Sequence, residues 1–316
     1  MSKKPNDHSD NEVPNLVISR SVQRTSRTVP VSESLREEGL PSAEAAKEAS
    51  VAPGSPEPSL PASEASKDPA ATTVFLPSRF EFYPFKSISV LPVGGFHQAK
   101  FSRAAKEKLT RHVVEAVSTL LPEGIDAADL TVPDFYFILY WLRLNCYTRA
   151  QLVHKGVCRD HKHVAQVREG KKPADSLVNL VTVTKTSLKQ EELPHDYLGD
   201  WQPEPSLLEK ADYYPCTMRD VISLEEDFDD LPPESMDELE YLADLASFIR
   251  IKGNPEATLR ERIQLLEKAN PDELESIALY RQAVSNYGVE EFIKFKCKEC
   301  GAETETAISI SAHSFL

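Results

Sequence analysis

The chain has 316 residues and a formal net charge of −14 at pH 7. This acidic balance argues against binding to the phosphate backbone of nucleic acids as the main task, without excluding a local basic patch. No apolar run reaches the roughly 18 residues that a membrane-spanning helix needs, and the start of the chain lacks the apolar region of a secretory signal.

Residues 1–73 are expected to form a disordered arm, rich in Pro, Ser, Ala and Glu. No aromatic residue precedes Phe75, and nine of the 23 prolines lie in the first 70 residues. A segment of this composition cannot bury enough apolar surface to offset the entropy lost on ordering. Residues 74–316 are then the folded domain, long enough for a sizeable hydrophobic core.

The folded part is expected to open with an extended region and a helix. Aromatic and β-branched residues alternate between prolines up to a Gly94–Gly95 turn, and they predict a strand at Ser87–Val93. Apolar residues at three- and four-residue steps then predict a one-sided helix, which Ser102 would cap and which would end near Pro122.

A second helix is predicted from the stretch "TVPDFYFILYWLRLN". Thr131 and Asp134 fit a capping box, with Pro133 in the first turn. The body of this helix is apolar on every side, which indicates a central, buried position.

The middle of the chain gives weaker signals. Residues 176–185 have the pattern of a strand, and 213–224, which include the letters "MRDV", suggest another extended piece. Nine of the sixteen residues from 225 to 240 are acidic, and we interpret this segment as a solvated loop that runs into a helix. A calcium site is not expected there, because the ligand order of a calcium-binding loop is missing.

The last third predicts three short helices packed as a small bundle, at about 236–251, 259–269 and from Pro271 to Gly288. Capping boxes open the first two, with Ser235 and Thr258 as the cap residues. Strand-like segments then flank the C-x-x-C motif. The expected fold class is therefore α+β, predominantly helical with short strands and a zinc-ribbon-like pair of knuckles, behind a disordered N-terminal arm.

The C-x-x-C motif near the end of the chain is half of a tetrahedral metal site. Cys297 and Cys300 form this half, and a glycine follows them. Cys158 and His161 have the same spacing, with histidine in the second place, and zinc accepts both thiolate sulfur and imidazole nitrogen. We therefore predict a Cys3His zinc site from Cys158, His161, Cys297 and Cys300, with His163 as the alternative fourth ligand.

Four protein ligands leave no open coordination position, so this Zn²⁺ would be structural. Its expected role is to clamp the end of the chain to the loop after the central helix. The alternatives are a buried free thiol at Cys158 with ordinary surface histidines, or a redox C-x-x-C motif. The redox motif needs its first cysteine at the start of a helix within a βαβ unit, and the sequence after the motif leaves no room for one.

Motifs of common enzyme classes do not occur in the sequence. It has no phosphate-binding G-x-x-x-x-G-K, no G-x-G-x-x-G, no H-E-x-x-H and no G-x-S-x-G. The five cysteines are an odd number, which fits a reducing compartment better than a disulfide framework. We therefore expect synthesis in the cytosol, no catalytic residues, no bound organic cofactor and no small-molecule substrate.

The order of these segments resembles the baseplate hub and hub-assembly proteins of T-even-like, contractile-tailed bacteriophages. In that family an L-P-S…Y-P start, a central D…L-R helix with an aromatic residue soon after it, and a closing C-x-x-C-G stretch recur. The matching positions here, all within 74–316, are Leu76, Pro77, Ser78, Tyr83, Pro84, Asp134, Leu142, Arg143, Tyr147, Cys158, Cys297, Cys300 and Gly301. Two features depart from the pattern: the inner knuckle has His161 where the family has cysteine, and the N-terminal arm is additional.

The resemblance implies a non-enzymatic structural or chaperone-like assembly protein of a phage tail baseplate. Its partners would be other baseplate or hub proteins, and it would be found in the host cytoplasm during assembly or in the virion tail. An alternative from another class is a zinc-knuckle adaptor that binds nucleic acid or a transcription or repair complex. The adaptor hypothesis predicts a basic face near the knuckle.

Overall fold

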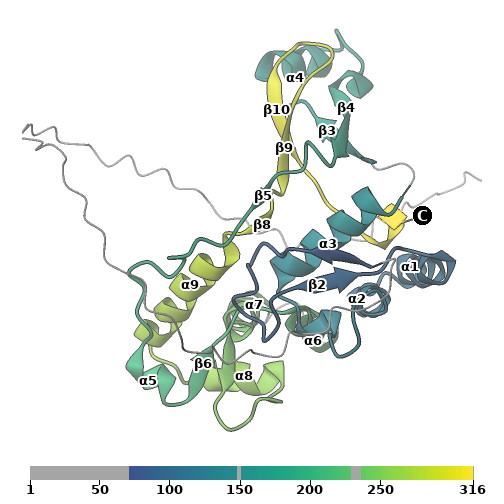
Figure 1. The fold of residues 1–316 in the computed structure, drawn as a ribbon. Coiled ribbons are helices and arrows are strands. Elements are labelled where there is room, and N and C mark those ends of the chain that lie inside the picture. The colour runs from purple at the N-terminus through teal and green to yellow at the C-terminus, as the bar shows by residue number, and fades with distance from the viewer. Residues whose placement is uncertain (1–70, 148–150, 229–235, 316) are drawn as a thin grey trace, which may run out of the picture. The chain divides into compact units, whose positions relative to one another are not determined.

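The computed structural model describes residues 71–147, 151–228 and 236–315 (Figure 1). The expected arm lies outside these residues except for its last three positions, and so does the expected helix cap at Ser235. The described part combines helices with short strands, and its strands pair antiparallel in two-stranded sheets. None of the helices in this described part has both the length and the apolar content that crossing a membrane requires.

The first elements surround one buried helix. They are β1 (Thr72–Val74), β2 (Ile88–Val90), α1 (Gly95–Glu107), α2 (Thr110–Ser118), the 3-10 helix η1 (Ala127–Asp129) and α3 (Val132–Asn145). Helix α3 is central and buried, as its uniformly apolar sequence predicts. Its buried apolar side chains are Phe135, Phe137, Ile138, Leu139, Tyr140, Leu142 and Leu144.

The expected start of the first helix at Ser102 is wrong. Helix α1 already begins at Gly95, and Ser102 lies inside it. The chain then turns at Lys108, whose backbone is left-handed with a φ of 55°, before α2 starts. One expected helix is therefore two helices that pack against each other, because Lys108 ends the first by a C-terminal cap of the kind more often made by glycine.

The middle segment forms a long hairpin with a helical insertion. It contains β3 (Gln151–Val157), α4 (His161–Arg168), the 3-10 helix η2 (Ala174–Leu177), β4 (Val178–Thr184) and β5 (Gln190–Glu191). Strands β3 and β4 pair along their full length, from Gln151 opposite Thr184 to Val157 opposite Val178. The predicted strand at 176–185 is confirmed as β4.

The next part is mostly helical and has its own core. It contains α5 (Pro205–Leu208), β6 (Ala211–Tyr213), α6 (Met218–Phe228), α7 (Met236–Ala246), β7 (Ile249–Ile251), α8 (Leu259–Leu266) and α9 (Pro271–Ser285). The predicted capping box at Thr258 opens α8, with Glu261 as its partner. The predicted start of the third helix at Pro271 is also found in α9, where Asn270 caps the helix and forms a capping box with Glu273. A core made mainly by these elements is formed by Leu207, Ala211, Ala243, Leu245, Ala246, Phe248, Ile249, Leu259, Ile263, Leu266, Ile277, Tyr280 and Val284.

Two expectations for this part are wrong. The stretch "MRDV" is the first turn of helix α6, not an extended piece, because the buried Asp220 accepts hydrogen bonds from the backbone N–H and hydroxyl of Thr217 and so caps the helix start. The first helix of the expected bundle ends at Ala246 rather than 251, and its last residues form β7, which pairs with β6.

The end of the chain returns to the hydrophobic core around α3, which is the first core. Strand β8 (Gly288–Val289) pairs with β5, and β9 (Phe292–Lys296) forms a hairpin with β10 (Glu303–Ala307), as the alternation on both sides of the C-x-x-C motif predicts. In the final 3-10 helix η4 (Ala312–Phe315), the ring of Phe315 stacks on Phe101 of α1 with 4.1 Å between centroids. Both hairpins therefore leave the first core and return to it (Figure 1).

Candidate metal centre

Two turns far apart in the sequence bring four metal-ligand side chains together. Cys158, His163, Cys297 and Cys300 each offer one ligand atom, and these atoms lie within 4.8 Å of one another. The Sγ atoms of Cys158 and Cys300 are 3.6 Å apart, and the Sγ of Cys297 is 3.6 Å from Nδ1 of His163. The first three residues in this set are buried and Cys300 is exposed.

The first turn follows β3 and fixes which histidine joins the cluster. Asp160 caps helix α4, and its side chain accepts a hydrogen bond from the N–H of His163. Successive residues of an α-helix are rotated by about 100°, so His161 and His163 point to nearly opposite sides. His163 is 1% exposed and belongs to the cluster, whereas His161 is exposed and does not.

The second turn joins β9 to β10. The N–H of Cys297 donates to the carbonyl of Ala302, and the N–H of Gly301 donates to the carbonyl of Cys297, both at 2.9 Å. Gly301 has a φ of 72°, a conformation that glycine adopts without steric cost. This tight turn folds Cys300 back toward Cys297, so the C-x-x-C-G spacing produces a two-sulfur knuckle.

A hydroxyl behind His163 sets the tautomer of its ring. Nε2 of His163 lies 3.1 Å from Oγ of Ser176, and that hydroxyl donates its own hydrogen to the carbonyl of Pro173 at 2.6 Å. Since the hydroxyl hydrogen is used, Ser176 accepts from Nε2–H. The lone pair of His163 is therefore on Nδ1, which faces the sulfur of Cys297 and is the atom that a metal would bind.

Asn179 links the two turns. Its side-chain amide donates to the Sγ of Cys297 at 3.7 Å, and its Oδ1 accepts from the backbone N–H of Lys298 at 2.9 Å. Asn179 is the second residue of β4 and is 3% exposed. It therefore holds the C-terminal knuckle against the β3–β4 hairpin independently of any bound ion.

The two buried thiols of the cluster differ in acidity. Burial raises the pKa of Cys297, but N–H donors from Cys300, Glu299 and Asn179 outweigh this effect and hold the pKa at about 6. Burial and the neighbouring sulfurs raise the pKa of Cys158 to about 11. One negative charge thus concentrates on Cys297, and a cation placed among the sulfurs would stabilise further thiolates.

The cluster corresponds closely to the predicted ligand set, with one correction. Cys158, Cys297 and Cys300 come together as predicted, and the fourth residue of the cluster is the alternative His163 rather than the first choice His161. Ser176 and Asn179 were not predicted, because single Ser and Asn residues give no sequence signal for contact with a distant turn. The donor set is compatible with a structural metal ion.

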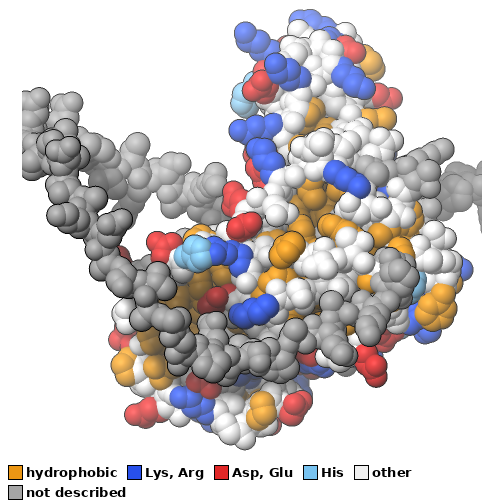
Figure 2. Space-filling model, in the orientation of Figure 1, with side chains coloured by type: hydrophobic (Ala, Val, Ile, Leu, Met, Phe, Trp, Pro, Cys, Tyr) orange, Lys and Arg blue, Asp and Glu red, His pale blue; other side chains and the backbone are white. Residues whose placement is uncertain are grey.

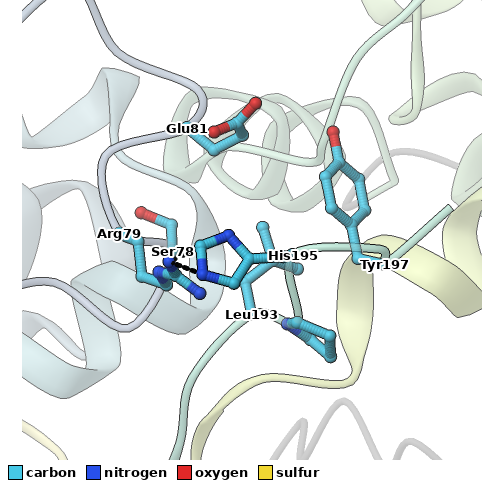
Figure 3. Close-up of a pocket in the computed structure, with 7 residues that line it drawn as sticks. Ser78, Arg79, Glu81, Leu193, His195 and Tyr197 are labelled. Carbon is cyan, nitrogen blue, oxygen red and sulfur yellow. Dashed lines mark hydrogen bonds between the residues drawn. The ribbon is translucent and has the colours of Figure 1, made fainter. Parts of the chain in front are cut away.

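A shallow hollow away from the cluster is lined by Ser, His and Glu side chains, which are also the residue types of hydrolase active sites. Ser78, Arg79, Glu81, Leu193, Pro194, His195 and Tyr197 line a volume of about 110 Å³ (Figure 3). The guanidinium of Arg79 contacts the ring of His195, with 2.9 Å to Nδ1. Ser78 instead bonds with the buried carboxylate of Asp134 and accepts from the N–H of Phe80, so it is not paired with His195 as a nucleophile with its base.

Comparison with known proteins gives no family for this chain. No family model, curated protein or solved structure matches it. The resemblance drawn from the segment order therefore stays a prediction.

Proposed function

We propose that Cys158, His163, Cys297 and Cys300 bind one structural Zn²⁺ ion. The observation that carries this proposal is the convergence of three thiols and one imidazole nitrogen from two turns onto a common point. Zinc takes four such ligands at about 2.0–2.3 Å, so tetrahedral ligand atoms lie about 3.3–3.8 Å apart. The separations of 3.6 Å between the sulfurs of Cys158 and Cys300, and between the sulfur of Cys297 and Nδ1 of His163, fall within this range.

The ion would act as a clamp between the two hairpins. Cys158 directly follows β3 and His163 lies on α4, whereas Cys297 and Cys300 belong to the β9–β10 turn. Binding would cross-link the long stretch of chain between these turns and lower the entropy of the unfolded state. Because all four ligands come from the protein, the site would serve stability rather than catalysis.

For the whole protein we propose a non-enzymatic structural or assembly role in the baseplate of a contractile phage tail. The residues that carry the resemblance make contacts within the first core and at its edge. The N–H of Ser78 and the hydroxyl of Tyr83 both donate to Asp134, and Arg143 and Tyr147 donate to the carbonyls of Ser314 and Phe315. Because these residues make structural contacts, the resemblance that they carry supports a shared fold more than a shared reaction.

One observation favours the adaptor hypothesis as a second candidate. Residues 151–184, which include the first knuckle, contain six Lys and Arg but only three Asp and Glu, in a chain with a net charge of −14. Lys and Arg side chains also gather over the top of the view in Figure 2, where α4 and the hairpins lie. A basic surface beside a zinc knuckle is what a nucleic-acid adaptor needs.

The metal clamp is tested by elemental mass spectrometry on protein purified without added metal. We expect close to one zinc per chain, with zinc lost in Cys297→Ser/Cys300→Ser and in His163→Ala. The matched control His161→Ala should keep its zinc, because that side chain lies outside the cluster. Zinc-free wild-type protein with five titratable thiols and an intact fold would contradict the clamp.

The baseplate role needs a separate measurement. Gold-labelled antibody against the chain, applied to phage tails and assembly intermediates from cells that express it, should label the baseplate end or its intermediates. If the antibody labels nucleic acid and leaves the tails and assembly intermediates unlabelled, the adaptor hypothesis is favoured instead.

A further inference from the structure

The two hairpins of the metal lobe, defined as residues 151–184 and 292–307, have outer faces of different character: four of the six outward side chains of β9–β10 are charged, and the other two are Phe292 and Ala307. In the β9–β10 hairpin, Lys296 lies opposite Glu303 and Lys294 lies opposite Glu305 on the outer face. Lys296 and Glu303 form an ion pair at 3.4 Å. Alternating charge of this kind is what a solvated hairpin face carries.

The outer face of the β3–β4 hairpin is apolar instead. Val153, Val157, Val178 and Leu180 all lie on it, with exposed fractions of 54%, 50%, 44% and 59%. The alternate residues of both strands point the other way, where Leu152 and Val183 join the first core. The four aliphatic side chains therefore form one contiguous exposed patch rather than scattered surface residues.

The inner face of the same hairpin is already covered. A methyl group at Gly156 would lie 2.6 Å from the ring of Phe295 and 3.0 Å from Val181, so the β9–β10 hairpin packs directly against this strand. The exposed patch is consequently not a surface left open for the second hairpin, which occupies the opposite side.

Basic side chains border the patch and acidic ones are absent from this face. Lys155 lies on the face itself, opposite Leu180, while Arg159 and Lys185 follow the ends of the two strands. All three are exposed, and within the described residues no ion pair involves them. The outer face of β3 and β4 consists of Gln151, Val153, Lys155, Val157, Val178, Leu180, Thr182 and Thr184.

These features select one kind of occupant. A second copy of the chain is disfavoured, because two basic lobes would repel and a patch on the order of a few hundred Å² is below the roughly 800 Å² per partner of a stable interface. Single-stranded nucleic acid is disfavoured as well, since its bases stack on aromatic side chains and none of the eight outward residues of β3 and β4 is aromatic. An acidic protein segment with alternating aliphatic residues satisfies both the charge and the apolar surface.

We propose that the outer face of the β3–β4 hairpin is a docking surface for an acidic, amphipathic segment of a partner protein. The aliphatic residues of the segment would cover Val153, Val157, Val178 and Leu180, and its carboxylates would pair with Lys155, Arg159 and Lys185. This inference goes beyond the structural zinc site, which holds the hairpin in place but does not contact the partner.

The test uses the zinc-loaded full chain and a fluorescent synthetic peptide that alternates valine and glutamate. Fluorescence anisotropy should show binding that weakens as salt rises, because exposed charge pairs are screened. The double variant Val153→Thr/Leu180→Gln should bind at least about tenfold more weakly, since it removes apolar area from the contact. Lys155→Glu should weaken binding at low salt by about three- to tenfold.

Matched controls separate this surface from other exposed apolar residues. Leu279 on α9 is 50% exposed, so Leu279→Gln makes the same change outside the lobe and should leave binding unchanged. A peptide that alternates valine and lysine should not bind. Zinc content and thermal stability of each variant are measured alongside, so that failure of the metal clamp is distinguished from failure of docking.

Four results would overturn the proposal. They are no binding of the acidic peptide by zinc-loaded wild-type protein, equal binding by the double variant, equal binding of the lysine peptide, and tighter binding of a labelled oligonucleotide that Lys155→Glu abolishes. If the wild-type chain forms a dimer and Val153→Thr/Leu180→Gln does not, the occupant of this surface is a second copy of the chain and not a partner segment.

Discussion

At the residue scale, the candidate metal site depends on side chains behind the ligands. The hydroxyl of Ser176 accepts from Nε2–H of His163 and so keeps Nδ1 free of a proton. In Ser176→Ala this orientation is lost, and we expect zinc affinity to fall roughly 10–100-fold.

A chelator competition titration measures the effect. Ser176→Thr keeps a hydroxyl at the same position and should restore most of the affinity. If Ser176→Ala and wild-type protein release zinc at the same chelator concentration, the hydroxyl does not orient the ring.

A buried carboxylate in the second core gives a pH-dependent prediction. A hydrogen bond from Lys210 lowers the pKa of Glu273, which also accepts from the N–H of Asn270 and from Ser206. A carboxyl group whose pKa is lower in the folded state contributes stability above its unfolded pKa and loses it as pH falls through the folded value. We therefore expect Glu273→Gln to be less stable than wild type by about 1 kcal/mol at neutral pH.

The difference should shrink below pH 4.5, the ordinary pKa of this group, and vanish in stronger acid. Urea denaturation at a series of pH values measures it, and taking the difference from wild type removes the contributions of the other titrating groups. Glu275→Gln, at an exposed position two residues later, should show no such difference. A constant difference between wild type and Glu273→Gln at every pH would contradict the linkage.

At the element scale, close contact between the two hairpins requires glycine at position 156. A Cβ atom there would lie 2.6 Å from Cε1 of Phe295, well inside van der Waals contact. Gly156→Ala should therefore destabilise the protein by about 1–3 kcal/mol, measured by thermal or urea unfolding.

Two further variants decide whether this clash is the cause. In Gly156→Ala/Phe295→Leu the smaller side chain leaves room for the methyl group, so the loss from the alanine should be smaller than in the wild-type background. Gly95→Ala changes a glycine with no atom within 4 Å of the new methyl group, at the first position of α1, and should cost nothing. Additive losses from Gly156→Ala and Phe295→Leu would show that the two residues do not compete for space.

At the scale of the whole described chain, the fold has two large hydrophobic cores that should respond differently to metal removal. The first core includes α3 and the inner face of the β3–β4 hairpin, and the second is formed mainly by α5 to α9. Chelation should lower the melting temperature, because a ligand at about a thousand times its dissociation constant stabilises a protein by roughly 4 kcal/mol.

Hydrogen exchange should show which part of the fold loses stability after chelation. Backbone amides of the metal lobe should lose protection after chelation, while those of α8 and α9 should keep theirs. A uniform loss across both cores would mean that the ion stabilises the entire fold as one cooperative unit.

Much of the fold followed from local patterns in the sequence. The burial of α3, the starts of α8 and α9, the β9–β10 hairpin and the β4 strand all rest on periodicity and capping, which act between residues a few positions apart. The predictions failed where contacts between residues far apart in the sequence determine the local structure. Asp220 accepts hydrogen bonds from Arg250 and Arg262, and this buried network stabilises α6 where the sequence favoured an extended piece.

For the candidate metal site, the sequence by itself determined the cysteines, because C-x-x-C-G is a short-range pattern whose turn geometry is local. It also placed the inner half near Cys158, since zinc ligands recur at knuckle spacing. Only the tertiary structure decided between His161 and His163, because the choice depends on the phase of α4 set by Asp160. The contacts of Ser176 and Asn179 likewise arise only when the two hairpins meet, which no local pattern encodes.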